Sequence, residues 1–195
     1  MAKKESTLKN MLIALLVITV VSGGILGFVY NLTKPAILQA DANKNLAAIN
    51  EVLKGSADIA STEVKVIDDL TYNLAYSADG QFIGAAIKTF SMNGFGGKVE
   101  LMVGVLGNGN INKVSVLSQA ETPGLGANMT NAKFIGQFDG KNPADYNLKV
   151  KKDGGDVDAI TAATISSRAV AEAVKKATDG FEANKSQFMK GGNNE

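Results

Sequence analysis

The sequence contains no cysteine and no histidine. Without cysteine, the chain cannot form disulfides, thiolate metal sites, iron–sulfur clusters or a lipid anchor on a cysteine side chain. Without histidine, it lacks the usual zinc ligand and the base of Ser-His-Asp catalysis. Any chemistry in which this protein takes part must therefore come from hydroxyls, carboxylates, backbone groups or a bound cofactor.

An excess of charge of one sign is also missing. The chain has 20 basic and 19 acidic residues, a net charge of +1, which gives no reason to expect nucleic acid as a partner. Its 195 residues are 45% hydrophobic, so the chain can bury a real core and is not disordered by composition. This length suits one domain of ordinary size with an appendage.

The appendage is an apolar segment near the N-terminus. Residues 11–30, MLIALLVITVVSGGILGFVY, carry no charge, and as a helix they would span about 30 Å, the thickness of the bilayer interior. The alternative is a cleaved signal peptide, but its apolar region is usually only about 7–15 residues long. We therefore predict a retained single-pass anchor. Lys3, Lys4 and Lys9 precede it, which predicts a cytoplasmic N-terminus, residues 1–10, and a C-terminal domain outside the inner membrane.

A stalk helix and linker are predicted for residues 31–60. Pro35 suits the first turn of a helix, because proline lacks the N–H that is unpaired there in any case. Apolar residues then recur with helical spacing, and Gly55 is expected to end the helix.

From Val64 onward, apolar and polar residues alternate with period two, which is typical of strands on a half-buried sheet. Asp79-Gly80 predicts one hairpin turn, and the segment 107–110, GNGN, predicts another. The later segment is mixed: residues 132–138 indicate a short helix and residues 146–150 a strand.

An amphipathic helix is predicted for residues 166–188, with Val170, Val174, Ala177 and Phe181 on its apolar face. Together these elements predict an α+β protein: one N-terminal transmembrane helix followed by an antiparallel-sheet domain with flanking helices over residues 61–190. Residues 191–195, GGNNE, are expected to be a disordered tail.

A cluster of hydroxyls precedes the last helix, in the sequence DAITAATISSRAV. Thr161, Thr164, Ser166 and Ser167 lie within seven positions, next to two alanines. A helix start offers unpaired N–H groups and a partial positive charge, which suit a phosphate. Ser166 and Ser167 would cap the helix or donate hydrogen bonds to phosphate oxygens. Simple capping by Thr164 or Ser166 is the competing interpretation, and the pattern alone favours it.

Two glycine-rich segments also invite a functional interpretation: SMNGFGGKVE, residues 91–100, and ETPGLGANM, residues 121–129. Glycine lets backbone N–H groups approach a ligand closely, although each segment alone is more simply a tight turn. Neither is a P-loop, since no Gly-Lys-Ser/Thr follows, and neither forms the strand–GxGxxG–helix fingerprint of dinucleotide sites.

Taken in order, NGFGGKVELMVGV, ETPGLG and DAITAATIS resemble the FMN-binding domain of the G subunit of Rnf ion-translocating oxidoreductases. The C subunit of the sodium-translocating NADH:quinone reductase shares that domain. The resemblance covers nearly the whole chain, including the single anchor. The combination of motifs is specific, whereas each motif alone is weak.

The resemblance implies one covalent FMN, joined through its phosphate to the last residue of a [Ser/Thr]-Gly-Ala-Thr pattern. Here the pattern is Thr161, Ala162, Ala163 and Thr164, so Thr164 is the implied attachment point, and Ala162 replaces the usual glycine. Four further residues are implied to line the flavin: Glu121, Thr122, Gly124 and Leu125. Thr161, Ala163 and Ser166, which lie next to the attachment point, are also predicted to bind the cofactor.

The implied function is electron relay within an Rnf-type membrane complex that couples electron transfer between ferredoxin and NAD to Na⁺ or H⁺ translocation. The implied partners are the other subunits of that complex and, during maturation, a flavin transferase. Two alternatives stay open at this point. One is the C subunit of the quinone reductase, whose chains are generally longer. The other is a flavin-free, membrane-tethered binding protein with the same fold.

Overall fold

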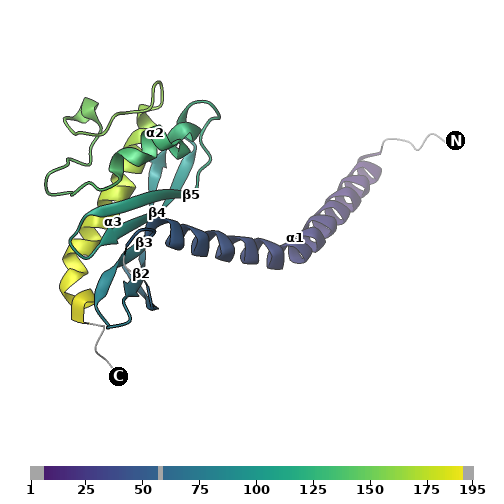
Figure 1. Ribbon diagram of the computed structural model, residues 1–195. Helices are drawn as coiled ribbons and strands as arrows, with labels where there is room; N and C mark the ends of the chain where they lie inside the picture. The colour runs from purple at the N-terminus through teal and green to yellow at the C-terminus, as the bar shows by residue number, and fades with distance from the viewer. Residues whose placement is uncertain (1–6, 57–58, 191–195) are drawn as a thin grey trace. The chain divides into compact units, whose positions relative to one another are not determined.

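The computed structural model of the chain describes residues 7–56 and 59–190 (Figure 1). The expected disordered tail, residues 191–195, lies outside the described residues, as do the first six residues of the expected cytoplasmic segment. The described chain divides into two units, one before Lys44 and one from Lys44 onward.

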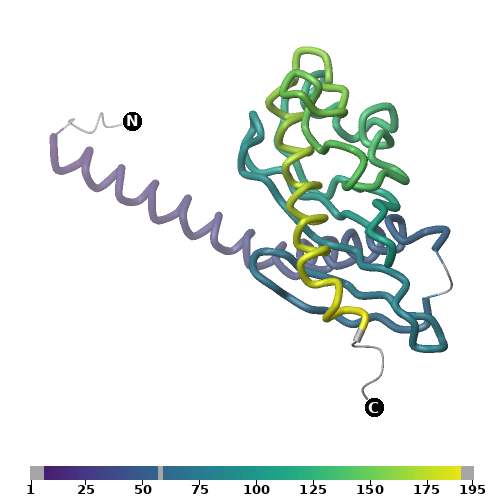
Figure 2. Tube along the Cα trace, turned by 90° about the vertical axis from the view of Figure 1, so that its left-hand side faces the viewer, coloured from purple at the N-terminus to yellow at the C-terminus, as the bar shows by residue number. Residues whose placement is uncertain are grey.

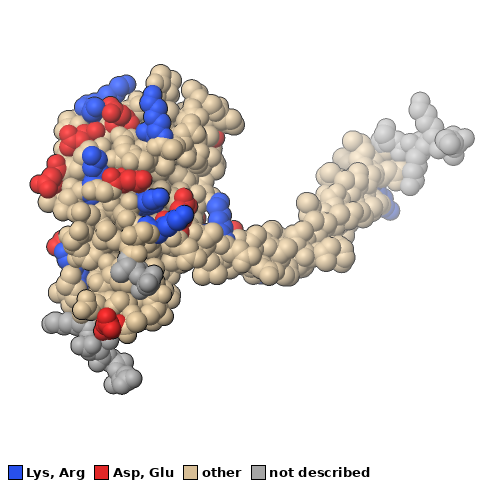
Figure 3. Space-filling view, viewed as in Figure 1, with Lys and Arg blue, Asp and Glu red and all other residues tan. Residues whose placement is uncertain are grey.

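The first element is one continuous helix, α1 (Leu8–Val52). By length and composition it can cross a membrane, and Figure 3 shows a long stretch of it without charged side chains on the face in view. Within the apolar stretch the Thr19 hydroxyl donates to the Leu15 carbonyl oxygen (2.9 Å), so this polar group has a partner inside the helix.

The prediction that Pro35 begins a separate stalk helix is wrong, because Pro35 lies inside α1. Proline removes one backbone hydrogen bond and crowds the preceding turn. The flanking residues, rich in Ala and Leu, favour helix, and a helix already formed on both sides needs no new nucleus. The helix instead ends as predicted near Gly55, whose φ of +83° suits a residue without a side chain.

The predicted antiparallel sheet has five strands in the order β1-β2-β3-β4-β5, each paired with its neighbour in sequence. Asp79-Gly80 lies in the β2–β3 turn, and residues 107–110 form the β4–β5 turn, so both predicted hairpins are confirmed. The strand bounds are β1 (Ser61–Ile67), β2 (Leu70–Tyr76), β3 (Phe82–Gly94), β4 (Gly97–Leu106) and β5 (Ile111–Ser118).

One face of the sheet is covered by the last helix, α3 (Thr164–Lys190), which runs across the strands (Figures 1 and 2). The four residues of its predicted apolar face are all buried. They pack against alternate residues of the strands, which form the larger hydrophobic core: Leu70, Tyr72 and Leu74 of β2, Ile87 of β3, and Leu101 and Val103 of β4.

The opposite face of the sheet holds the last turns of α1, where Ala48 and Val52 are buried. Gly104 on β4 makes this approach possible, since a Cβ there would fall on the Val52 carbonyl oxygen. The Asn112 side-chain amide on β5 donates to that same oxygen (2.7 Å) and to the Lys54 carbonyl (3.2 Å). These bonds satisfy carbonyls that the end of a helix leaves without partners.

The segment between β5 and α3 contains only short helical turns: η1 (Gly126–Thr130), α2 (Ala132–Ile135), η2 (Gly136–Phe138) and η3 (Lys151–Asp153). The predicted short helix at residues 132–138 corresponds to α2 and η2. The predicted strand at residues 146–150 is wrong, because only one isolated bridge, between Val150 and Val157, forms there. The Asn147 N–H instead donates to the Asp156 carboxylate (2.7 Å), which keeps this segment in a closed turn.

Replacing Gly104 by alanine should destabilise the domain by about 1–3 kcal/mol, because the added methyl group cannot fit against Val52. Gly107→Ala is the matched control, since a Cβ there meets its neighbours at ordinary contact distances, 3.4 Å and more. Thermal unfolding of the full chain in detergent measures both. Equal melting temperatures for the two variants would contradict the close packing of α1 on β4.

Candidate functional site

Three segments that are far apart in sequence meet around one cavity of about 330 Å³. They are the β3–β4 turn, the loop at residues 121–126 that leads into η1, and the start of α3. The residues that line the cavity are Phe95, Glu121, Thr122, Leu125, Gly126, Ala162, Ala163, Thr164, Ile165 and Ser166. The volume falls at the lower end of the range typical of small-molecule sites.

The rim of this cavity is apolar and exposed. Phe95 is 70% exposed, Leu125 42% and Ile165 48%. Exposing a large apolar side chain to water costs free energy. A group of such side chains around a cavity is therefore typical of a binding site. Each comes from a different one of the three segments, so together they can contact a flat aromatic ring system.

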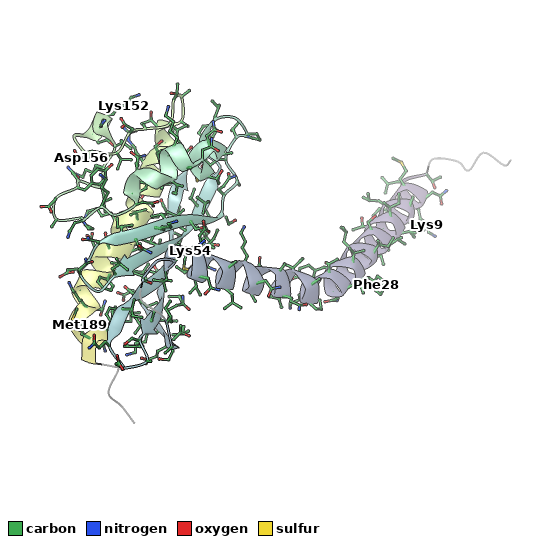
Figure 4. The ribbon with its side chains drawn as sticks, viewed as in Figure 1. Lys9, Phe28, Lys54, Lys152, Asp156 and Met189 are labelled. Carbon is green, nitrogen blue, oxygen red and sulfur yellow. The ribbon has the colours of Figure 1, made fainter. Side chains whose placement is uncertain are left out.

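Thr164 is the first residue of α3, and its hydroxyl lies 3.3 Å from the Lys152 ammonium nitrogen. The side chain is partly exposed and borders the cavity. Because the N–H groups of a first helical turn have no partner within the helix, a phosphate on this hydroxyl would meet both backbone donors and a lysine. Lys152 lies in η3, at the end of the domain far from Met189 (Figure 4).

The η3 turn that carries Lys152 is tied to α3 by a bidentate ion pair. Arg168 donates from Nε and Nη2 to the two carboxylate oxygens of Asp153, both at 2.7 Å. These hydrogen bonds from Arg168 hold the pKa of Asp153 below its usual range. Sequence reasoning missed Lys152, because it lies twelve positions before Thr164 and only the fold brings the two together.

The two serines after Thr164 point inward. Ser166 is buried and donates its hydroxyl proton to Glu121 Oε2 (2.7 Å). Ser167 is also buried; its hydroxyl accepts the Ile160 N–H (2.9 Å) and donates to the Ala163 carbonyl (2.9 Å). Ser167 thus joins the helix start to the preceding turn, whereas Ser166 borders the cavity.

The other predicted site residues divide between two neighbouring cavities. Glu121, Thr122, Ala163 and Thr164 line the first. Gly124 and Thr161 line a second cavity of about 440 Å³, which shares Leu125 and Ala162 with the first. Sequence reasoning did not assign Ile165 or Gly126 to the site. The sequence could have indicated Ile165: it is a large apolar residue beside the hydroxyl cluster, at a position off the buried face of the predicted helix.

Ala162 has a left-handed backbone conformation, with φ of +59°. It lies in a turn closed by a hydrogen bond from the Ala163 N–H to the Ile160 carbonyl (3.0 Å). A positive φ at this position of a turn favours glycine, which explains why the [Ser/Thr]-Gly-Ala-Thr pattern has glycine where this chain has Ala162. The constraint on position 162 therefore comes from its backbone.

Comparison with protein families gives a match between residues 94–179 and the model of the FMN-binding domain. The G subunit of the ion-translocating oxidoreductase complex of Vibrio cholerae is 37% identical, over 88% of each chain. The corresponding G subunits of Pseudomonas aeruginosa and Methanosarcina acetivorans are 33% and 32% identical, covering 96% and 90% of this chain and 94% of each relative.

Among solved structures, the chain is similar to the C subunit of the Na⁺-translocating NADH-quinone reductase of Parabacteroides distasonis. The TM-score is 0.53, over 78% of this chain and 96% of that one. The sequence identity of 19% means that this likeness concerns the fold alone.

Ala162→Gly should stabilise the protein by up to about 1 kcal/mol, because it relieves the cost of a left-handed residue that has a Cβ. Ala162→Val should destabilise it, since a β-branched residue at positive φ is a clear outlier. Ala159→Gly is the control: φ is not positive at Ala159, so that change should lower the melting temperature. A lower melting temperature for Ala162→Gly would show that the left-handed turn does not form.

Proposed function

The chain belongs to the family of G subunits of ion-translocating oxidoreductase (Rnf-type) complexes, and we propose that it relays electrons through a bound FMN. In this proposal the complex couples electron transfer between ferredoxin and NAD to the translocation of Na⁺ or H⁺. The proposal rests on the membership of the family and on the match of residues 94–179 to an FMN-binding domain.

A single arrangement supports the proposal best: an accessible threonine hydroxyl beside a cavity with an exposed apolar rim. Phe95, Leu125 and Ile165 provide apolar surface for the ring system, and Thr164 lies at the helix start where a phosphate is favoured. Bound FMN would supply the one- and two-electron chemistry that a chain without cysteine and histidine lacks.

We further propose that one FMN is attached covalently at Thr164. The flavin transferase would act on a flavin dinucleotide: the threonine oxygen would form a P–O bond to the phosphorus of the FMN half as the phosphoanhydride bond breaks, the nucleoside monophosphate half would leave, and the hydroxyl proton would pass to solvent. Lys152, 3.3 Å from the hydroxyl oxygen, would neutralise part of the negative charge of the phosphodiester. Of the two threonines in the pattern Thr161 to Thr164, Thr161 lines the neighbouring cavity and Thr164 lines the first, at the start of α3.

For the location of the protein, we propose a single-pass anchor in the inner membrane with residues 31–195 outside the cytoplasm. The apolar part of α1 supports the anchor, and the lysines that precede it support the orientation. The other subunits of the complex would then contact the protein within or at the surface of the membrane.

The two alternative functions differ from this proposal in observable ways. A role as the C subunit of the quinone reductase is less well supported, because the curated relatives at 32–37% identity are G subunits and the likeness to the C subunit concerns the fold. A flavin-free binding protein would carry no flavin after purification from its native membrane.

Thr164→Ala should abolish covalent flavin while leaving the fold nearly intact, since among the described residues the Thr164 hydroxyl is hydrogen-bonded only to the exposed Lys152 side chain. The loss should be visible as the absence of in-gel flavin fluorescence after denaturing electrophoresis. Thr62→Ala, at an exposed threonine of β1, is the control and should keep full fluorescence. Persistent fluorescence in Thr164→Ala would rule out this residue as the attachment point.

The proposed orientation predicts that protease added to intact spheroplasts digests the domain of residues 31–195. The physical reason is the positive charge before the uncharged span, which keeps the N-terminus inside. Immunoblotting with an antibody against the domain measures digestion, and a cytoplasmic protein serves as the control for intact cells. Protection of the domain until lysis would reverse the topology.

A further inference from the structure

The buried carboxylate of Glu121 joins two of the walls of the cavity. Glu121 is 6% exposed. Its Oε1 accepts a hydrogen bond from the Gly96 N–H in the β3–β4 turn (3.1 Å), and its Oε2 accepts one from the Ser166 hydroxyl in the first turn of α3 (2.7 Å). Within residues 7–56 and 59–190, no lysine or arginine forms an ion pair with Glu121.

Two glycines provide the space that this carboxylate needs. A Cβ at Gly94 would lie too close to Glu121 Oε1, and a Cβ at Gly126 would fall on Glu121 Oε2 and on the Ser166 hydroxyl oxygen. Because Gly94 and Gly126 have no side chains, their backbone segments can approach the Glu121 carboxylate closely from two sides, and this defines its position. Neither glycine has a positive φ, so the space itself, and not the backbone conformation, requires glycine there.

The two bonded segments carry the groups that a flavin would contact. Gly96 directly follows Phe95 of the rim, while Ser166 lies two residues after Thr164 and one after Ile165. A hydrogen bond to a charged group is stronger than one between neutral groups. When such a bond is broken in the interior, the buried group left without a partner costs the full free energy of its desolvation. Glu121 therefore connects the Phe95 turn to the Thr164 helix start through one side chain.

We propose that Glu121 is a positioning residue, which holds Phe95 at the distance from Thr164 that lets one flavin lie against the rim while its phosphate is attached. This inference rests on the proposed function, and it gives Glu121 a role different from that of a residue that binds the flavin directly. Both carboxylate oxygens are occupied by protein donors, and those donors belong to the walls of the site.

Four variants separate positioning from general loss of stability, and because Ser166 itself borders the cavity, hydrogen exchange without flavin separates positioning from direct contact of Ser166 with the phosphate. Ser166→Ala breaks one of the two hydrogen bonds to Glu121 and leaves the Glu121 side chain in place. Glu121→Gln can keep both contacts, with its carbonyl accepting from Gly96 and its amide donating to Ser166, whereas Glu121→Leu keeps neither. Thr89→Val is the matched control: it removes another buried hydrogen bond between the sheet and α3, from the Thr89 hydroxyl to the Ala173 carbonyl (3.1 Å), away from the cavity.

The first measurement is FMN incorporation per protein in cells that contain the flavin transferase. We expect incorporation to fall severalfold in Ser166→Ala and Glu121→Leu, and to stay near the wild-type level in Glu121→Gln and Thr89→Val. Normal incorporation in Ser166→Ala would contradict positioning, and so would equal losses in Ser166→Ala and Thr89→Val. Absence of flavin from the wild-type chain would instead contradict the proposed function.

The second measurement does not depend on flavin. In a Thr164→Ala background, amide hydrogen exchange of residues 92–97 should be about tenfold faster or more with Ser166→Ala than without it, because one charge-assisted bond is lost. The added Thr89→Val change should leave this exchange unaltered. Unchanged exchange in the Ser166→Ala variant would overturn the proposal even where Glu121→Leu fails to fold.

Discussion

The packing of α3 on the sheet is the interaction on which the rest of the structure depends. Val170, Val174 and Phe181 are fully buried against the strands. Each such side chain contributes about 1.5–3 kcal/mol through burial. This packing holds α3 on the sheet, and the buried carboxylate of Glu121 then bonds the first turn of the helix to the β3–β4 turn.

Departures from ordinary folding preferences are concentrated where the helix begins. Ala162 has a positive φ, Phe95 and Ile165 are exposed, and the carboxylate of Glu121 is buried. Each of these features costs free energy in the domain without a ligand, and such costs are typical of functional sites. In the central strands, by contrast, residues packed against α3 alternate with residues packed against the last turns of α1, so the costs are local.

Local sequence patterns predicted the elements whose conformation is decided locally. Asp79-Gly80 and the 107–110 turn set two hairpins, and the spacing of Val170 to Phe181 set α3, because turn chemistry and helical period act over a few residues. The path of α1 through Pro35 could not be predicted in this way, since it depends on the helix formed on both sides of the proline. Residues 146–150 were predicted to form a strand, but the Asp156 carboxylate bonds the segment into a turn.

The site was predictable only in part for the same reason. The resemblance of three motifs assigned Thr164, Glu121 and Leu125, which the structure brings around one cavity. It gave no means of finding Lys152, which lies beside Thr164 in a turn that the Arg168–Asp153 ion pair joins to α3. The inward direction of Ser166 and the left-handed conformation of Ala162 likewise come from the packed structure, and both change how the motif is understood.

The central claim is that Thr164 carries a flavin in a chain that has no cysteine and no histidine. Trypsin should release the peptide of residues 153–168, which contains Thr161, Thr164, Ser166 and Ser167, from the protein purified out of its native membrane. Mass spectrometry of this peptide is the most direct test. The account predicts one FMN per peptide, with fragment ions that place it on Thr164. An unmodified peptide, or FMN on Thr161 or on either serine, would contradict it.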